Sequence, residues 1–80
     1  MTLQQLKYAA AIAAAGTISE AAQALSIAQP SLTNAMKKLE TELGIRIFMR
    51  TNKGVALSRE GEEFLAYASR VTEQATLLEE

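Results

Sequence analysis

The side chains with the greatest capacity for specific contacts lie along one predicted helix, residues 29–43. At 100° per residue, its apolar positions fall on one narrow stripe. That stripe consists of Leu32, Met36, Leu39 and Leu43. The opposite face carries Thr33, Asn34, Lys37, Lys38 and Thr41. Hydrogen-bonding groups thus precede the two lysines, an order that suits the base edges and then the phosphates of a nucleic acid. Alone, such a face is also typical of a solvated surface helix.

No arrangement of residues in the chain predicts catalysis. The sequence has no histidine and no cysteine, which excludes imidazole base catalysis, disulfides and the common zinc sites. The acid pairs Glu62-Glu63 and Glu79-Glu80 are neighbours in sequence, so their side chains diverge by about 100° on a helix and form no acid–base couple. We therefore expect that the chain is not an enzyme and holds no metal or cofactor.

Charge is distributed unevenly along the chain. The net charge is −1, whereas domains that bind nucleic acids are usually basic. Six of the eight basic residues nevertheless lie between positions 37 and 59, namely Lys37, Lys38, Arg46, Arg50, Lys53 and Arg59. No acid occurs from Leu43 through Arg59, and five of the nine acids follow position 61. This pattern predicts a basic working face and an acidic far end.

The first predicted helix has a packing role. It begins at Thr2, which can form a capping box with Gln5, and it ends at Gly16. Its apolar positions at helical spacing are Leu3, Leu6, Ala10 and Ala13, with Tyr8 and Ile12 beside them. Because alanines permit a close approach of other helices, we expect this helix to make core contacts only.

A short helix from about Ile18 to Leu25 precedes the polar helix. Thr17 can cap it, with Glu20 as the reciprocal capping partner. Its expected core positions are Ala21, Ala22 and Leu25. A three-residue linker then leads to the polar helix, which has a proline in its first turn and a glycine after its end. Residues 18–37 therefore have the pattern of a helix-turn-helix motif, whose second helix can enter a DNA major groove.

After Gly44 the pattern changes from helical to extended. Residues 45–50 alternate roughly between apolar and polar, 51–54 have turn chemistry, and 55–57 predict a second strand. The segment 45–57 is thus predicted to form a small β-hairpin, or wing. The residues near its tip are Arg50, Asn52 and Lys53. Such a wing commonly reaches backbone phosphates or the minor groove, although a solvated turn with incidental charges has the same pattern.

A last helix follows Ser58, which can cap it. Its apolar residues at intervals of four, three, four and three are Phe64, Ala68, Val71, Ala75 and Leu78. This is the seam spacing of a coiled coil over about two heptads, so we expect residues 59–80 to pair with a second copy of the chain. A helix that packs back on its own domain has a similar pattern, and Phe64 and Leu65 can be shared with the domain core.

Length and hydropathy predict one small, mainly helical domain with an appended helix. Of the 80 residues, 49% are hydrophobic and many of these are alanines. We expect residues 1–58 to form the winged helix-turn-helix domain and residues 59–80 the linker helix. No apolar run approaches the ~20 residues that span a bilayer, and the N-terminus lacks a signal-peptide pattern. These features predict a cytoplasmic protein without membrane contact.

With these elements in place, the chain resembles the N-terminal DNA-binding domain of the LysR-type bacterial transcriptional regulators, followed by the start of their linker helix. The residues that carry the resemblance are 16–22 (GTISEAA), Leu25, 28–33 (AQPSLT), 38–40 (KLE), 43–45 (LGI), Phe48, 50–51 (RT), 57–58 (LS) and Gly61. The match extends over essentially all 80 residues in order and register.

The resemblance implies sequence-specific binding of double-stranded DNA by a homodimer, paired through the linker helices, on an interrupted inverted repeat with T and A at matched positions. By position, it places Gln29, Ser31, Thr33, Asn34 and Lys38 of the recognition helix on DNA, together with Arg50, Asn52 and Lys53 of the wing. Members of the family are usually about four times longer, with a C-terminal domain that binds a small-molecule co-inducer, and they assemble into tetramers. We expect this chain to lack that effector-binding domain.

One departure from the family pattern affects specificity. The family often has Ser-Arg where this chain has Thr33-Asn34. An asparagine can pair bidentately with adenine N6 and N7, but it cannot supply the charged contact of an arginine. We therefore expect either a different base preference at this step or compensation of the missing charge by Lys37.

Two other readings of the sequence are open. One is another winged-helix regulator family, such as the molybdate-responsive one, with similar DNA chemistry and a different effector domain. The other is a protein-interaction module that uses the C-terminal helix and keeps the helix-turn-helix as a scaffold only. Loss of Lys37 and Lys38 would leave the partner affinity of such a module intact.

Overall fold

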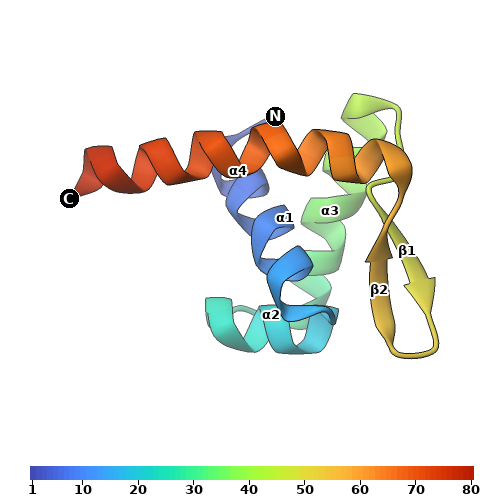
Figure 1. Cartoon of the computed structure of the whole chain (residues 1–80). Coiled ribbons are helices and arrows are strands. Elements are labelled where there is room, and N and C mark those ends of the chain that lie inside the picture. The colour runs from blue at the N-terminus through green and yellow to red at the C-terminus, as the bar shows by residue number, and fades with distance from the viewer.

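The computed structural model describes all 80 residues as four helices and one antiparallel hairpin. The elements are α1 (Leu3–Ala15), α2 (Ile18–Leu25), α3 (Gln29–Leu43), β1 (Phe48–Thr51), β2 (Gly54–Leu57) and α4 (Arg59–Glu79). Figure 1 shows α1, α2 and α3 grouped together, with the hairpin on one side and α4 crossing above them. The C-terminal half of α4 extends beyond the other elements. The bounds predicted for the second and third helices are confirmed.

Local capping interactions explain where the helices begin and end. The Thr2 hydroxyl accepts from the Gln5 N–H at 3.1 Å, and the Gln5 side chain accepts from the Thr2 N–H at 2.9 Å, which completes the predicted capping box. Gly16 ends α1 in the left-handed conformation, with φ 84°. Thr17 caps α2 by accepting from the Glu20 N–H at 3.1 Å. The predicted return bond from the Glu20 side chain is not formed, so only half of that second box is present.

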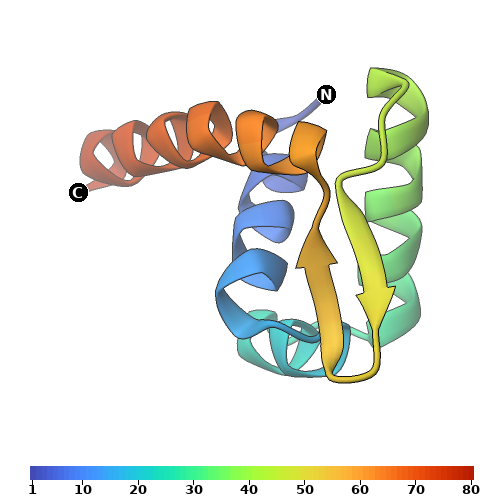
Figure 2. The same ribbon diagram turned by 45° about the vertical axis from the view of Figure 1, so that its right-hand side comes forward.

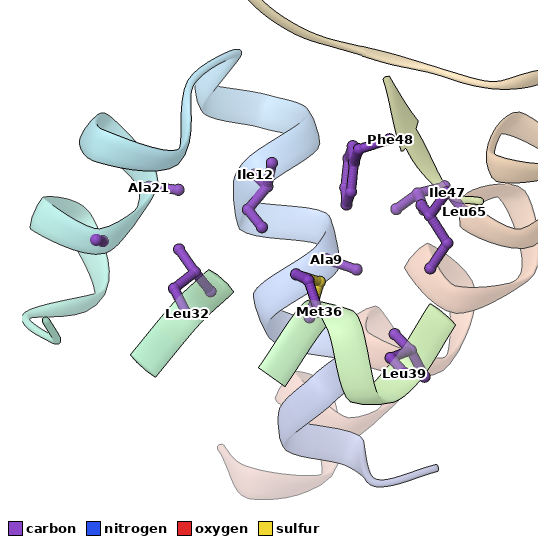
Figure 3. Close-up of a cluster of buried hydrophobic side chains, with 10 residues drawn as sticks. Ala9, Ile12, Ala21, Leu32, Met36, Leu39, Ile47, Phe48 and Leu65 are labelled. Atoms are coloured by element: carbon purple, nitrogen blue, oxygen red, sulfur yellow. The ribbon is translucent and has the colours of Figure 1, made fainter. Parts of the chain in front are cut away.

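The core lies where α1 meets the other elements. The fully buried large side chains are Ile12, Leu32, Leu39 and Ile47. In Figure 3, Ala9 and Ile12 of α1 lie between Ala21 and Leu32 on one side and Ile47, Phe48 and Leu65 on the other. The predicted α3 stripe is confirmed for Leu32, Met36 and Leu39, and Leu43 is half-buried at the helix end. Both Ala21 and Ala22 are buried as expected, whereas Leu25 is only half-buried.

The buried face of α1 differs from the predicted one. Its buried residues are Leu6, Ala9 and Ile12, whereas Leu3 and Ala13 are exposed. α1 is the central element, because it contacts α2, α3, α4 and β2. The alanines of α1 lie on all sides of the helix, so its apolar residues do not define one dominant face. The sequence pattern therefore does not show which side packs against which neighbour.

The hairpin is shorter than predicted at its start. β1 pairs with β2 from Phe48 opposite Leu57 to Thr51 opposite Gly54. The strand begins at Phe48 and not at Ile45, and the consecutive residues Ile47 and Phe48 are both buried, which breaks the expected alternation. The physical reason is that Ile47 is already engaged before strand pairing starts. Its N–H donates to the Glu40 carboxylate of α3, and the Ile47 side chain enters the core.

The hairpin is attached to the α1–α2 turn at a position where only glycine fits. The Val55 N–H donates to the Gly16 carbonyl oxygen at 2.9 Å. At Gly54 the backbone has φ 140°, and a Cβ there would lie 2.3 Å from the Gly16 oxygen. This close approach fixes the tip of the wing beside α2.

Hydrogen bonds join the start of α4 to the residues that immediately precede β1. The Ser58 hydroxyl accepts from the Gly61 N–H at 2.9 Å and donates to the Arg46 carbonyl, and the Ser58 N–H donates to the Ile47 carbonyl at 2.9 Å. A Cβ at Gly61 would lie 2.2 Å from the Ile47 oxygen. Small residues therefore let α4 approach the core closely. None of the four helices combines the length and apolar character that a membrane-spanning helix requires.

Candidate nucleic-acid interface

The polar face of α3 and the hairpin enclose a surface groove, here termed the α3–wing groove. One part lies between α3 and β1 and the other reaches the N-terminus of α2; Thr33 and Arg50 line both parts. Its polar and charged lining residues are Thr17, Ser19, Gln29, Thr33, Lys37, Glu40, Arg46, Arg50 and Thr51. Figure 2 shows the cause of this arrangement, because β1 runs alongside α3 whereas β2 lies nearer α1.

The structure brings together some of the residues predicted to bind and separates others. Gln29, Thr33 and Lys37 are one helical turn apart in succession, and they line the groove with Arg50 of β1. Outside the groove, the exposed recognition-helix candidates are Ser31, Asn34 and Lys38. The wing candidates Asn52 and Lys53 are exposed in the turn of the hairpin. The predicted site thus has a recessed part and a rim.

The orientation of the rim residues follows from helix geometry. Ser31 and Lys38 are seven residues apart, so they share one side of α3, about 180° from Gln29. Asn34 projects between these two sides, opposite the buried stripe. A partner that contacts both sides must meet α3 near its N-terminal end or wrap around its outer face.

The cations of this surface have no carboxylate partners within the chain. The only ion pairs are the amino terminus with Glu42 and Lys7 with Glu79, the second at 3.3 Å. The basic residues without an ion pair are therefore Lys37, Lys38, Arg46, Arg50, Lys53 and Arg59, with Arg70 on α4. A set of exposed cations that are not neutralised internally is suited to an external polyanion.

Arg46 and Glu40 are groove residues that the sequence interpretation did not assign to the site. Arg46 belongs to the basic cluster of residues 37–59, and its place two residues before β1 is a usable signal that links it to the site. The Glu40 carboxylate accepts from the Ile47 N–H at 2.7 Å and from the Phe48 N–H at 3.2 Å. An acid in the last turn of a helix opposes the helix dipole, so such a residue calls for a compensating interaction. Glu42 of the same turn shares that anomaly, so the signal alone does not single out Glu40.

The predicted dimerisation seam on α4 divides between two environments. Ala68 is buried against its own domain, and Phe64 and Ala75 are half-buried. Val71 and Leu78 remain uncovered, with 48% and 89% of their surface exposed. Tyr67, which sequence reasoning did not include, is 69% exposed beside them, and the Arg70 guanidinium lies 6.0 Å from its ring centroid. Pairing through this seam stays a prediction.

These elements define a winged helix-turn-helix domain, with α2 and α3 as the motif and β1–β2 as the wing. Residues 3–62 match the family described as bacterial regulatory helix-turn-helix protein, lysR family, and the chain belongs to that family. The predicted resemblance is therefore confirmed, and the alternative of a different winged-helix regulator family is wrong.

Two curated relatives illustrate the family. The chain is 40% identical over 75 residues to the HTH-type transcriptional regulator TcbR of Pseudomonas sp. (strain P51), covering 94% of this chain and 26% of the relative. It is 45% identical over 65 residues to the HTH-type transcriptional regulator TfdT of Cupriavidus pinatubonensis, covering 81% and 28%. The chain thus spans about a quarter of the length of these relatives, and both are transcriptional regulators.

Solved structures of two DNA-binding domains in complex with DNA have the same fold. The chain is 39% identical to the protein in the CbnR DNA-binding domain–DNA complex, with a TM-score of 0.89, and the match covers 95% of this chain and 87% of that one. The BenM domain complex with benA site 1 DNA is 33% identical, with a TM-score of 0.91, covering 98% and 91%. The chain is accordingly a LysR-type DNA-binding domain.

Proposed function

We propose that this chain binds double-stranded DNA sequence-specifically, with α3 in the major groove and the wing on the adjacent backbone or minor groove. The observation that carries the proposal is the α3–wing groove, which hydrogen-bonding residues of α3 line together with the unpaired cations Arg46 and Arg50. An α-helix fits the major groove, and cations beside it match the flanking phosphates. The DNA complexes of CbnR and BenM domains support this reading by likeness.

The residues divide into two proposed roles. Residues near the N-terminus of α3 carry amide or hydroxyl groups that can pair with base edges: Gln29, Ser31, Thr33 and Asn34. Residues that are cationic, or that belong to the wing turn, contact phosphates or enter the minor groove: Lys37, Lys38, Arg50, Asn52 and Lys53. Arg46 joins this second set because it lines the same groove.

The acting unit is proposed to be a homodimer on an interrupted inverted repeat. Val71, Leu78 and Tyr67 give α4 an exposed apolar strip that a second α4 can cover. Residues 1–58 supply DNA contact and 59–80 the linker helix, although Leu65 also belongs to the domain core. For the full-length protein we propose transcriptional regulation in the bacterial cytoplasm, by a tetramer with a co-inducer-binding domain, since the relatives are about four times longer.

Substitution of groove cations tests the proposal. Lys37→Ala combined with Arg50→Ala should weaken binding to every duplex and reduce the slope of log affinity against log salt by about two, because each phosphate contact contributes about 0.9. The matched control is Lys7→Ala with Arg70→Ala, which removes two cations outside the groove and should leave the slope unchanged. Equal slopes for both double variants would contradict the assignment. An unchanged affinity of the groove variant for its main partner would also contradict it, and would indicate a protein-interaction module.

A further inference from the structure

Glu40 makes contacts that join the recognition helix to the wing. One carboxylate oxygen, Oε2, accepts from the N–H groups of Ile47 and Phe48, at 2.7 and 3.2 Å. The backbone carbonyl of the same residue accepts from the N–H groups of Gly44 and Ile45, at 2.9 and 3.3 Å. A single residue thus accepts from four of the five backbone N–H groups between Gly44 and Phe48, where the chain passes from α3 to β1.

The position of this carboxylate is otherwise unfavourable. It lies in the last turn of α3, where the helix dipole disfavours an acid. It also lines the α3–wing groove, in which the other charged residues are the cations Lys37, Arg46 and Arg50. A negative charge in a groove that faces phosphates opposes binding. The hydrogen bonds of Glu40 to Ile47 and Phe48 must therefore explain why an acid occupies this position.

The contacts of Glu40 fix the point at which β1 begins. The Ile47 N–H is held by Glu40 from α3, while the Ile47 carbonyl accepts from the Ser58 N–H at the start of α4. The strand start is therefore fixed from both sides. Arg50 follows Phe48 by two residues on the same strand, so the two side chains project from the same face. A shift of Phe48 relative to α3 consequently displaces Arg50 from the groove.

We propose that Glu40 is a positioning residue for DNA binding: it sets the wing at the distance from α3 at which the base contacts of the helix and the phosphate contact of Arg50 are made together. This role rests on the proposed function of the groove. Glu40 itself touches no DNA. Its carboxylate accepts hydrogen bonds from two backbone donors and forms no ion pair with Lys37, Arg46 or Arg50, so these cations are free for phosphates.

Two substitutions separate this role from a simple effect of charge. Glu40→Gln retains a side-chain oxygen that can accept both N–H groups, whereas Glu40→Ala removes the acceptor. If Glu40 positions the wing, Glu40→Gln keeps the parent affinity within about threefold and Glu40→Ala loses about tenfold or more. If Glu40 acts only as a repulsive charge, both variants bind DNA more tightly than the parent, which would overturn the proposal.

A double-mutant cycle tests whether the effect passes through the wing. Arg50→Ala should cost at least about fivefold less affinity in the Glu40→Ala background than in the parent, because the wing is already displaced. Lys38→Ala, on the far side of α3, should cost the same in both backgrounds. Glu42→Ala serves as the matched control background, in which Arg50→Ala should cost as much as in the parent. Glu42 lies in the same turn as Glu40, but it contacts only the amino terminus. Additivity of Glu40→Ala with Arg50→Ala would overturn the positioning role.

A measurement without DNA distinguishes failure of this inference from failure of the proposed function. Backbone amide exchange at Ile47 and Phe48 should accelerate by about tenfold or more in Glu40→Ala and remain near the parent rate in Glu40→Gln and Glu42→Ala. Unchanged exchange in Glu40→Ala would overturn the positioning role even if DNA binding is present. If the parent bound no duplex at low salt, the proposed function would fail, and the role of Glu40 in binding would fail with it.

Discussion

At the scale of single residues, Asn34 is the position on the recognition helix at which we expect a changed base preference. It is exposed on the outer face of α3, next to the groove residue Thr33 and one turn before Lys38. The proposed contact is a bidentate pair with adenine, which carries base preference and no net charge.

Replacing Asn34 by arginine should therefore change both preference and affinity. We expect Asn34→Arg to favour guanine over adenine at the contacted step and to steepen the salt dependence by about one phosphate contact. Competition assays with duplexes that vary at each position measure the first effect, and a salt series measures the second. Gln23→Arg adds the same charge at an exposed position of α2 and should alter neither the base preference nor the salt dependence. An unchanged preference profile in Asn34→Arg would show that Asn34 does not read a base.

The amino-acid sequence reveals the polar candidates on the surface of α3 and the wing more readily than the residue that supports them. Thr33, Lys37 and Arg50 could be selected because polar and basic types opposite an apolar stripe are visible in the chain itself. Glu40 could not be selected in this way. Its value depends on two backbone N–H groups that come seven and eight residues later, and only the folded connection shows where those donors point.

At the scale of elements, local capping signals predicted the helices well, whereas contacts between distant segments decided the rest. Thr2, Thr17, Gly16 and Gly44 act within a few residues of their own helix, so the pattern alone marks those ends. The start of β1 depends instead on contacts with α3 and α4. The buried face of α1 likewise depends on the four elements that surround it.

The attachment of the wing to the α1–α2 turn gives a prediction at this scale. Gly54→Ala should lower the free energy of unfolding by about 3 kcal/mol, because it combines left-handed backbone strain with a clash against the Gly16 carbonyl. Gly44→Ala meets nothing within 4 Å at φ 70°, so it should cost only about 1 kcal/mol of conformational strain. Urea denaturation followed by circular dichroism measures both. Similar losses in the two variants would contradict the close approach at Gly54.

At the scale of the whole molecule, α4 serves both the domain and the proposed dimer. Its first half packs on the core through Leu65 and Ala68, and its second half extends past the other elements. The seam spacing in the sequence cannot separate these two uses, because packing on α1 and pairing with a second α4 both require apolar residues at the same spacing. The exposure of Val71 and Leu78 distinguishes them.

The dimer prediction follows from that exposure. Val71→Glu with Leu78→Glu should raise the dimer dissociation constant by about tenfold or more, because it places like charges in the paired strip. Ala66→Glu with Leu77→Glu adds the same charge to another exposed side of α4 and should have little effect. Sedimentation equilibrium measures the association. If the two double variants dissociated equally, the strip at Val71 and Leu78 would not be the interface.

The central claim, sequence-specific DNA binding through the groove cations, is tested most directly by fluorescence anisotropy. A labelled duplex with a T…A interrupted inverted repeat is compared with a scrambled duplex of equal length across a salt series. We predict tighter binding to the repeat, with log affinity falling linearly and steeply as log salt rises. Absence of binding to either duplex at low salt would contradict the account.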